Sequence, residues 1–282
     1  MKEYILTLSC PDKTGIVHAV SGWLLGQQGN IIDSQQFGDV GTQRFFMRVH
    51  FSLPQAQEAA DLEASFAEVR ERFGMDAAIY DNERRSRVLL LVSRQGHCLN
   101  DLLFRTHTGQ LPLDIVGVAS NHRDFENMSR AYGVPFHYLP VSAETRAQQE
   151  AQILELVDKE KVDLVVLARY MQILSDNLCR ALEGKAINIH HSFLPSFKGA
   201  RPYHQAHARG VKIIGATAHY VTADLDEGPI IEQDVKRVHH ALSAEELTRV
   251  GSDVESLVLA RAVRWHVEHR ILLNGQRTVV FD

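Results

Sequence analysis

Continuous apolar runs, separated by longer amphipathic segments, constrain the fold of this chain more than any other sequence feature. Residues 88–92 are apolar throughout, and the further predicted strands at 114–119, 163–168 and 185–189 are largely apolar after a charged first residue. An uninterrupted apolar run is typical of a strand buried on both faces of a parallel sheet, because strands with one solvated face alternate apolar and polar residues. Helical patterns at 97–107 and 143–159 lie between the runs. This alternation predicts a doubly wound α/β domain, in which ligands bind at the carboxyl ends of the strands.

The first eighty residues follow a different pattern, with strand and helix signals in the order βαββαβ. The strands are expected at 4–10, 31–37, 44–51 and 77–80, and the helices at 15–28 and 54–73. This order usually gives a four-stranded antiparallel sheet with both helices on one face, the ferredoxin-like arrangement. The charged segment at 81–87 separates the two patterns. We therefore predict one domain over residues 1–82 and a second over residues 86–282.

Charge and cysteine usage exclude several classes of protein. The 282 residues include 30 Lys and Arg against 35 Asp and Glu, a net charge of −5 that gives no general field for binding nucleic acid. The three cysteines, Cys10, Cys98 and Cys179, are too scattered for a disulfide framework. Neither a signal peptide nor an apolar run of about 20 residues is found. We expect a cytoplasmic protein that has neither nucleic acid nor a membrane as its partner.

Polar residues that can carry chemistry gather near the ends of two predicted strands. Strand alternation places Asn188 and His190 on one side of a strand end, before a loop rich in Pro and Gly. The strand at 213–221 leads into a polar loop that contains Asp226. Hydrolysis or transfer of an acyl group needs an amide to stabilise an oxyanion, an imidazole to move a proton and a carboxylate to orient water. These three residues therefore form a candidate catalytic site.

Two other kinds of site compete for the same residues. A metal site is one alternative, because the His204-x-x-His207 spacing is used by zinc proteins, but solvated or capping histidines are the more common case. A serine nucleophile at Ser192 or Ser196 is the other, but the Gly-x-Ser-x-Gly turn of such hydrolases is missing. His191 either shapes the pocket or packs beneath it, and His97 and Cys98 either line the water site or begin a helix. We predict no metal ligand.

Several motifs resemble the formyltransferase family that uses 10-formyltetrahydrofolate, and most closely its deformylase branch. They are Asn-x-His at 188–190, His-His-Ser-Phe-Leu-Pro at 190–195, Ile-Gly-Ala-Thr-Ala-His-Tyr-Val at 214–221 and the Asp at 226. The N-terminal pattern, with Cys-Pro-Asp-Lys-Thr-Gly-Ile-Val at 10–17, resembles an ACT domain, an amino-acid-sensing module. The resemblance covers nearly the whole chain and implies an ACT domain followed by a formyltransferase-type Rossmann-like domain.

The resemblance also implies a role for individual residues. The family's catalytic trio falls on Asn188, His190 and Asp226, with His219 as a supporting residue. The residues that the resemblance assigns to folate binding are Met171, Gln172, Ile173, Leu174, Val221, Thr222, Asp224 and His219. Gln172 stands where relatives commonly carry Arg, so the charge of that side chain is missing here. Lys198 and Arg201 are expected either to steer the glutamate tail of folate or to be exposed.

The implied reaction is hydrolysis of 10-formyltetrahydrofolate to formate and tetrahydrofolate, which supplies formate for purine synthesis and balances the one-carbon folate pools. It requires no cofactor, since folate is the substrate. The alternative is formyl transfer to an amine such as glycinamide ribonucleotide. Such transferases follow their first strand with a Gly-rich loop that holds phosphate, whereas residues 93–101 contain one glycine. A third possibility is a non-catalytic amino-acid sensor.

The ACT resemblance implies regulation and assembly. Family members sense amino acids such as methionine and glycine, and their sheets often pair, so we expect a homo-oligomer, a dimer or a tetramer. Asp12 and Gly15 at the start of the first helix either bind the effector or only cap that helix.

Overall fold

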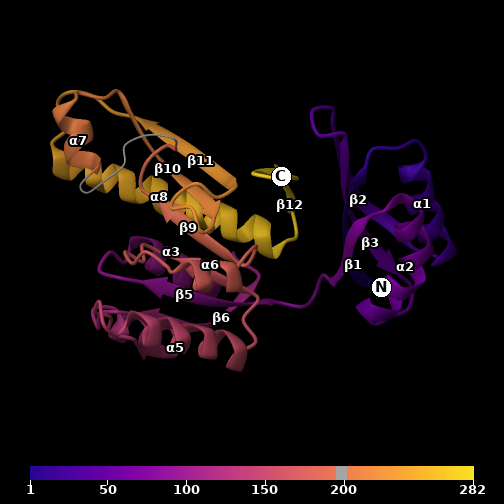
Figure 1. The fold of residues 1–282 in the computed structure, drawn as a ribbon, viewed down its shortest axis with the longest axis horizontal. Helices are drawn as coiled ribbons and strands as arrows, with labels where there is room; N and C mark the ends of the chain where they lie inside the picture. The colour runs from indigo at the N-terminus through magenta and orange to yellow at the C-terminus, as the bar shows by residue number, and fades with distance from the viewer. Residues whose placement is uncertain (195–201) are drawn as a thin grey trace. The chain divides into compact units, whose positions relative to one another are not determined.

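The computed structural model describes residues 1–194 and 202–282 (Figure 1). Contacts divide the chain into a first unit, Met1–Arg85 with Glu268–Asp282, and a second unit, Ser86–Val267. Residues 268–282, which the sequence pattern places in the second domain, thus group with the first. Ser196, Lys198 and Arg201 lie outside the described residues. Within the described ranges, no helix is long and apolar enough to cross a membrane.

The first unit has the predicted βαββαβ order. Its elements are β1 (Lys2–Pro11), α1 (Ile16–Gly26), β2 (Asn30–Asp39), β3 (Arg44–Leu53), α2 (Ala59–Phe73) and β4 (Asp76–Asp81). The strands pair antiparallel in the order β2-β3-β1-β4. Helix α2 begins later than the pattern predicts, because the Tyr4 hydroxyl donates to Gln57 O at 2.7 Å and accepts from Gln57 N at 2.8 Å. These bonds hold the residues before Ala59 outside the helix.

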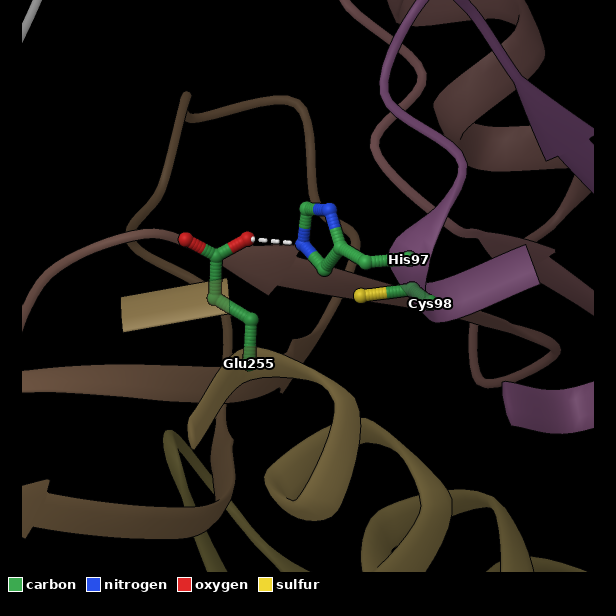
Figure 2. A group of neighbouring side chains, drawn as sticks. All are labelled: His97, Cys98 and Glu255. Carbon is green, nitrogen blue, oxygen red and sulfur yellow. Dashed lines mark hydrogen bonds and ion pairs between the residues drawn. The ribbon is translucent and has the colours of Figure 1, made fainter. Parts of the chain in front are cut away.

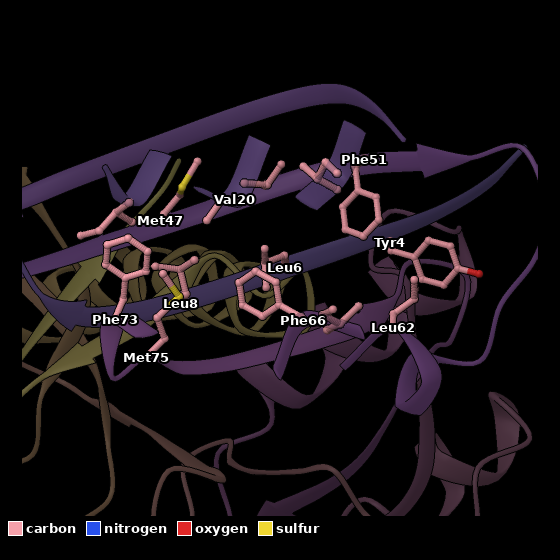
Figure 3. Packing of buried hydrophobic residues seen from close by; sticks show 14 of the residues in the cluster. Tyr4, Leu6, Leu8, Val20, Met47, Phe51, Leu62, Phe66, Phe73 and Met75 are labelled. Carbon is pink, nitrogen blue, oxygen red and sulfur yellow. The ribbon is translucent and has the colours of Figure 1, made fainter. Parts of the chain in front are cut away.

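An aromatic and aliphatic core joins this sheet to its two helices (Figure 3). Trp23 of α1 packs edge-on against Phe66 of α2, with ring centroids 4.8 Å apart. Tyr4 stacks on Phe51 at 5.6 Å, which ties β1 to β3. Full burial of one such side chain contributes about 1.5–3 kcal/mol, so the core accounts for the integrity of this unit.

The C-terminal hairpin packs on the first unit. It consists of β12 (Ile271–Asn274) and β13 (Arg277–Val280). Leu272 and Phe281 bury their side chains against Phe46 of β3. The buried guanidinium of Arg48 donates to Glu268 O at 3.0 Å and to His269 O at 3.1 Å. An apolar cluster and a buried cation therefore attach the end of the chain to this sheet.

Replacing Arg48 should release this hairpin. Arg48→Met keeps the apolar stem but leaves two carbonyl groups without their donor, at a cost of about 3 kcal/mol for two charge-assisted hydrogen bonds. We expect a lower unfolding free energy and faster proteolytic cleavage within 268–282. Chemical denaturation and limited proteolysis followed by mass spectrometry measure the two effects. Cleavage at the wild-type rate would show that Arg48 does not hold the hairpin.

The second unit is the predicted doubly wound domain. Its elements up to the middle of the sheet are β5 (Ser86–Val92), α3 (His97–His107), β6 (Leu113–Ser120), α4 (Glu126–Ala131), β7 (Phe136–Tyr138), α5 (Arg146–Lys159), β8 (Leu164–Leu167), α6 (Asp176–Ala181) and β9 (Ala186–His190). Then follow α7 (Pro202–Ala208), β10 (Ile213–Tyr220), β11 (Ile230–Arg237) and α8 (Ala244–Val267). The described strands form one sheet in the order β11-β10-β9-β8-β5-β6-β7.

The strand order places the ligand-binding edge. Strands β5 to β9 run parallel, whereas β10 and β11 are antiparallel to their neighbours. The first strand, β5, lies between β6 and β8, so the chain reverses its direction of travel across the sheet at this point. Ligands in such sheets bind at the carboxyl ends of the strands beside this reversal. The residues that follow β5, β8 and β9 therefore define the place where a site is expected.

Candidate active site

A cavity of about 410 Å³ lies at the ends of β8, β9 and β10 in the second unit. Its lining includes the predicted catalytic trio, the supporting histidine and the predicted folate-binding segments: Asn188, His190, Asp226, His219, Met171, Gln172, Ile173, Leu174, Val221, Thr222 and Asp224. His191 lines it as well, which answers the question that the sequence left open about its place. His204 and His207 are exposed on α7 and do not belong to the lining.

Asp226 contacts two histidines. His190 Nδ1 lies 3.2 Å from Asp226 Oδ2, and His219 Nε2 lies 3.7 Å from Asp226 Oδ1. Because a carboxylate only accepts, His190 carries a proton on Nδ1 and directs Nε2 away from Asp226. Burial alone raises the pKa of the Asp226 carboxyl, but the contacts with His190 and His219 outweigh burial and hold this pKa well below its usual range. Asp226 is therefore an anion at neutral pH.

The sheet register sets the orientation of Asn188. Asn188 and His219 are register partners on β9 and β10. His219 Nδ1 donates to Tyr220 O at 2.8 Å, so in the neutral ring Nε2 is free to accept from Asn188 Nδ2 at 3.3 Å. This chain of bonds turns the amide NH₂ of Asn188 toward the histidines. The second N–H of that group remains for an oxygen of a ligand.

A strained turn carries Asp226 to this position. Asp226 has φ of +58°, a left-handed conformation that costs a residue with a side chain about 1 kcal/mol. The following Gly228 has no room for a side chain, because a Cβ there would lie 1.8 Å from Tyr220 O. Tyr220 N also donates to Pro229 O at 2.9 Å. The loop thus packs closely against the end of β10. This packing keeps the Asp226 carboxylate in contact with His190 and His219.

The opposite wall follows β8. Arg169 also has a left-handed φ, +65°, and Ser93 at the end of β5 binds the backbone on both sides of the turn. Ser93 N donates to Arg169 O at 3.1 Å, and Met171 N donates to Ser93 Oγ at 3.0 Å. Beyond this turn, Met171 and Ile173 are more than half exposed. Exposed apolar side chains beside a cavity suit a flat, largely apolar ligand.

His97 and Cys98 do not line this cavity. They lie beside Glu255 (Figure 2). His97 begins α3, and its Nε2 lies 2.7 Å from Oε2 of the almost completely buried Glu255 on α8. The possible ligand atoms of His97, Cys98 and Glu255 lie within 4.8 Å of one another. Burial raises the pKa of the Cys98 thiol, which disfavours the thiolate that a metal needs.

The Glu255 carboxylate has other partners than a metal. Tyr203 Oη donates to Glu255 Oε1 at 2.6 Å, and Arg169 Nε lies 3.4 Å from Oε2. The guanidinium already neutralises this anion and would repel a second cation. Sequence reasoning missed Arg169 and Glu255. The available signals were a cation directly after the buried run at 163–168 and a lone acid within the apolar stretch of α8.

A partly buried histidine on α8, in contact with Tyr220 of β10, predicts how stability depends on pH. Burial lowers the pKa of His266 to about 4, and its Nδ1 lies 2.8 Å from Tyr220 Oη. The unfolded chain binds this proton near pH 6.5, so stability is full above about pH 6.5 and is lost as the pH falls toward 4, by at most about 3 kcal/mol. Denaturation at pH 7.5 and 4.5 measures the loss. We expect a smaller loss for His266→Asn, and an unchanged one would contradict this assignment.

A larger cavity, of about 760 Å³, lies on the first unit. Its lining includes Lys2, Glu58, Asp81 and His269 but neither Asp12 nor Gly15. It holds none of the residues predicted to be catalytic. The cavity at the ends of β8, β9 and β10 is therefore the candidate active site, because it alone of the two combines an amide, two imidazoles and a carboxylate in contact.

Comparison with known proteins agrees with this geometry. The formyl transferase family matches residues 86–263. A formyltetrahydrofolate deformylase of Corynebacterium sp. (strain P-1) is 51% identical over 99% of this chain and 98% of its own length. The crystal structure of a formyltetrahydrofolate deformylase from Burkholderia mallei is 51% identical and covers all of both chains with a TM-score of 0.96. That of a glycinamide ribonucleotide transformylase from Symbiobacterium toebii is 31% identical, with a TM-score of 0.67, and covers 72% of this chain and 97% of its own.

The two kinds of relative differ in how much of the chain they match. The transformylase leaves more than a quarter of this chain without a counterpart, whereas the deformylases match both units. Full-length identity at this level, together with the match of the second unit, shows that the chain belongs to the formyltetrahydrofolate deformylase family of formyl transferases.

Proposed function

We propose that the protein hydrolyses 10-formyltetrahydrofolate to formate and tetrahydrofolate. The observation that carries the proposal is the contact between the ionised Asp226 and His190 beside the amide of Asn188, in a chain that belongs to the deformylase family. An amide donor, an imidazole and a carboxylate within hydrogen-bond reach of one another are the groups that attack of water on a formamide requires.

Each member of the trio has a role in the proposed reaction. Asp226 accepts the proton of the attacking water, directly or through His190, while the water oxygen bonds to the formyl carbon. Asn188 donates its free N–H to the formyl oxygen as that oxygen becomes negative. The C–N bond then breaks, the nitrogen of the folate takes the proton, and formate leaves. All atoms of the products come from the folate and one water, and no step passes through a metal or a cofactor.

The exposed apolar wall is the proposed folate-binding surface. We assign the ring system to Met171, Ile173 and Leu174 on one side and to Val221 and Thr222 on the other, all of which line the cavity. Gln172, Asp224 and His219 supply polar groups at its margin. Gln172 carries no charge, so the glutamate tail of the folate gains no ion pair from this position.

Two observations favour water over a phosphate-bearing amine as the acceptor. The transferases hold phosphate at the start of the helix that corresponds to α3. Here the first residue of α3, His97, is hydrogen-bonded to the Glu255 carboxylate, and this negative charge would repel a phosphate. Gly96 before this helix lies under Phe125, since a Cβ there would be 2.4 Å from its ring. The start of α3 is therefore closely packed and already contacts an anion.

Formate release without an added acceptor tests the function. The purified protein is incubated with 10-formyltetrahydrofolate, and both formate and tetrahydrofolate are measured. We expect stoichiometric release of both. Formyl transfer to glycinamide ribonucleotide, with tetrahydrofolate formed only when this amine is present and with no release of formate, would establish the alternative. No turnover under either condition would support the non-catalytic sensor.

The first unit is proposed to regulate this reaction. Its βαββαβ fold, shared over the full chain with the deformylase of Burkholderia mallei, supports amino-acid sensing, with methionine and glycine as the proposed effectors. We also propose a homo-oligomer, a dimer or a tetramer, and a role in supplying formate for purine synthesis. Titration of each amino acid against turnover tests the regulation, and no response at millimolar concentration would leave the unit a structural role. Sedimentation measures the oligomer.

A further inference from the structure

Arg169 connects a buried charged network to the candidate active site. Its Nη1 lies 2.8 Å from His191 Nδ1, and its Nε lies 3.4 Å from Glu255 Oε2. Gln95 Oε1 accepts from Nε at 2.8 Å and also from Nη2. Arg169 is 6% exposed and adopts a left-handed φ, so backbone and side chain are both constrained. Gln95 and Glu255 thus fix the guanidinium, which directs one N–H of Nη1 toward His191.

This contact determines where His191 carries its proton. A guanidinium has only donors, so His191 Nδ1 accepts and the proton of the neutral ring lies on Nε2. Burial, with the nearby Arg169 cation and His190, lowers the pKa of His191 to about 4. Adding a second proton would place an N–H on Nδ1 against the Arg169 cation. His191 is therefore a neutral ring whose Nε2 is a donor at physiological pH.

His190 and His191 form a stacked pair with opposite proton positions. Their ring centroids are 4.7 Å apart and their planes differ by 20°. His190 donates from Nδ1 to the anion Asp226, whereas His191 accepts at Nδ1 from the cation Arg169. The Nε2 atoms of both rings are buried without a hydrogen-bond partner among the described residues. Both residues line the cavity, so a neutral pair presents one acceptor and one donor there.

We propose that Arg169 is a positioning residue that fixes His191 as an Nε2–H donor, and that His191 donates this hydrogen bond to the formyl oxygen of the substrate. A donor lowers the barrier only at an oxygen that gains negative charge; during hydrolysis the formyl oxygen gains it, whereas the attacking water loses a proton. His191 thereby adds a second donor to that of Asn188. This inference rests on the proposed hydrolysis.

Two substitutions at His191 separate donation from packing. His191→Leu fills similar space without a donor, and its kcat should fall by about 10²–10³, with KM changed by no more than about threefold, as for loss of an oxyanion donor. His191→Gln restores an N–H near the position of Nε2, and its kcat should be at least tenfold higher than that of His191→Leu. His240→Leu, at an exposed histidine, is the matched control and should match the wild type. Equal rates for Leu and Gln, or a faster Leu variant, would overturn the role of His191.

A spectroscopic experiment on the intact protein tests Arg169 independently of activity. In protein labelled with ¹⁵N-histidine, His191 should show an unprotonated Nδ1 and a protonated Nε2 from pH 7.5 down to pH 5. Arg169→Met should shift the ring toward a mixture of both forms. A protonated Nδ1 in the wild type would refute the inference even if the variant does not fold. If the wild type releases no formate while this tautomer is observed, the proposed function fails and the positioning by Arg169 stands.

Discussion

Asp226→Asn is expected to lower kcat for formate release by about 10²–10⁴, because it removes the carboxylate that accepts the proton of the attacking water. Asparagine has nearly the same shape and tolerates the left-handed conformation that residue 226 adopts. The loop should therefore keep its structure while the charge is lost. Initial rates of formate release at saturating 10-formyltetrahydrofolate measure the effect.

The control for this variant makes the same chemical change elsewhere. Asp253→Asn replaces an exposed carboxylate on α8 and should leave kcat unchanged. Thermal melting should place all three proteins at the same transition temperature within about 2 °C, since a change of 1 kcal/mol shifts Tm by roughly 2–4 °C at this size. Wild-type turnover by a folded Asp226→Asn variant would exclude Asp226 as the base.

Asn188→Ala should have the second largest effect, a fall of about 10²–10³ in kcat, because it removes a hydrogen bond that strengthens as the formyl oxygen becomes negative. KM should change little, since the bond to the neutral formyl group is weaker than the bond to the oxyanion. Steady-state kinetics over a range of folate concentrations separate the two constants. Asn177→Ala, at an exposed amide on α6, is the matched control.

The outcome of this experiment also distinguishes two roles for Asn188. If its main role is to orient His219, whose Nε2 accepts from the amide, then His219→Gln should lower kcat as much as Asn188→Ala does. If Asn188 acts on the formyl oxygen, its removal should be the more harmful of the two changes. A kcat for Asn188→Ala within threefold of the wild type would contradict both roles.

The two left-handed residues illustrate how the site is built. Arg169 and Asp226 both adopt φ values that favour glycine, and both lie in the lining of the same cavity. Packing against the ends of β5 and β10 holds these turns in place. The strain is small, about 1 kcal/mol for each residue. It is offset by the packing that fixes the Arg169 guanidinium beside His191 and the Asp226 carboxylate beside His190.

Much of the fold was predictable from local patterns. The apolar runs identified the buried strands because a strand covered on both faces excludes polar residues, and the alternation of strands with helices left few possible topologies. The proposed catalytic trio was selected from the sequence because Asn188 and His190 share one strand end and because the motifs around them resemble a known family. In the structure these residues contact Asp226 and His219.

Only the tertiary structure revealed the contacts made between distant segments. No local signal assigns the C-terminal hairpin to the first unit, because its attachment depends on Phe46 and on the buried cation of Arg48. Nor does a local pattern pair Arg169 with Glu255 or give His191 its proton position, since burial and hydrogen-bond partners decide both. Periodicity thus determined by itself the buried central strands and the longer helices, whereas the charge states and proton positions of the site depend on side chains that only folding brings together.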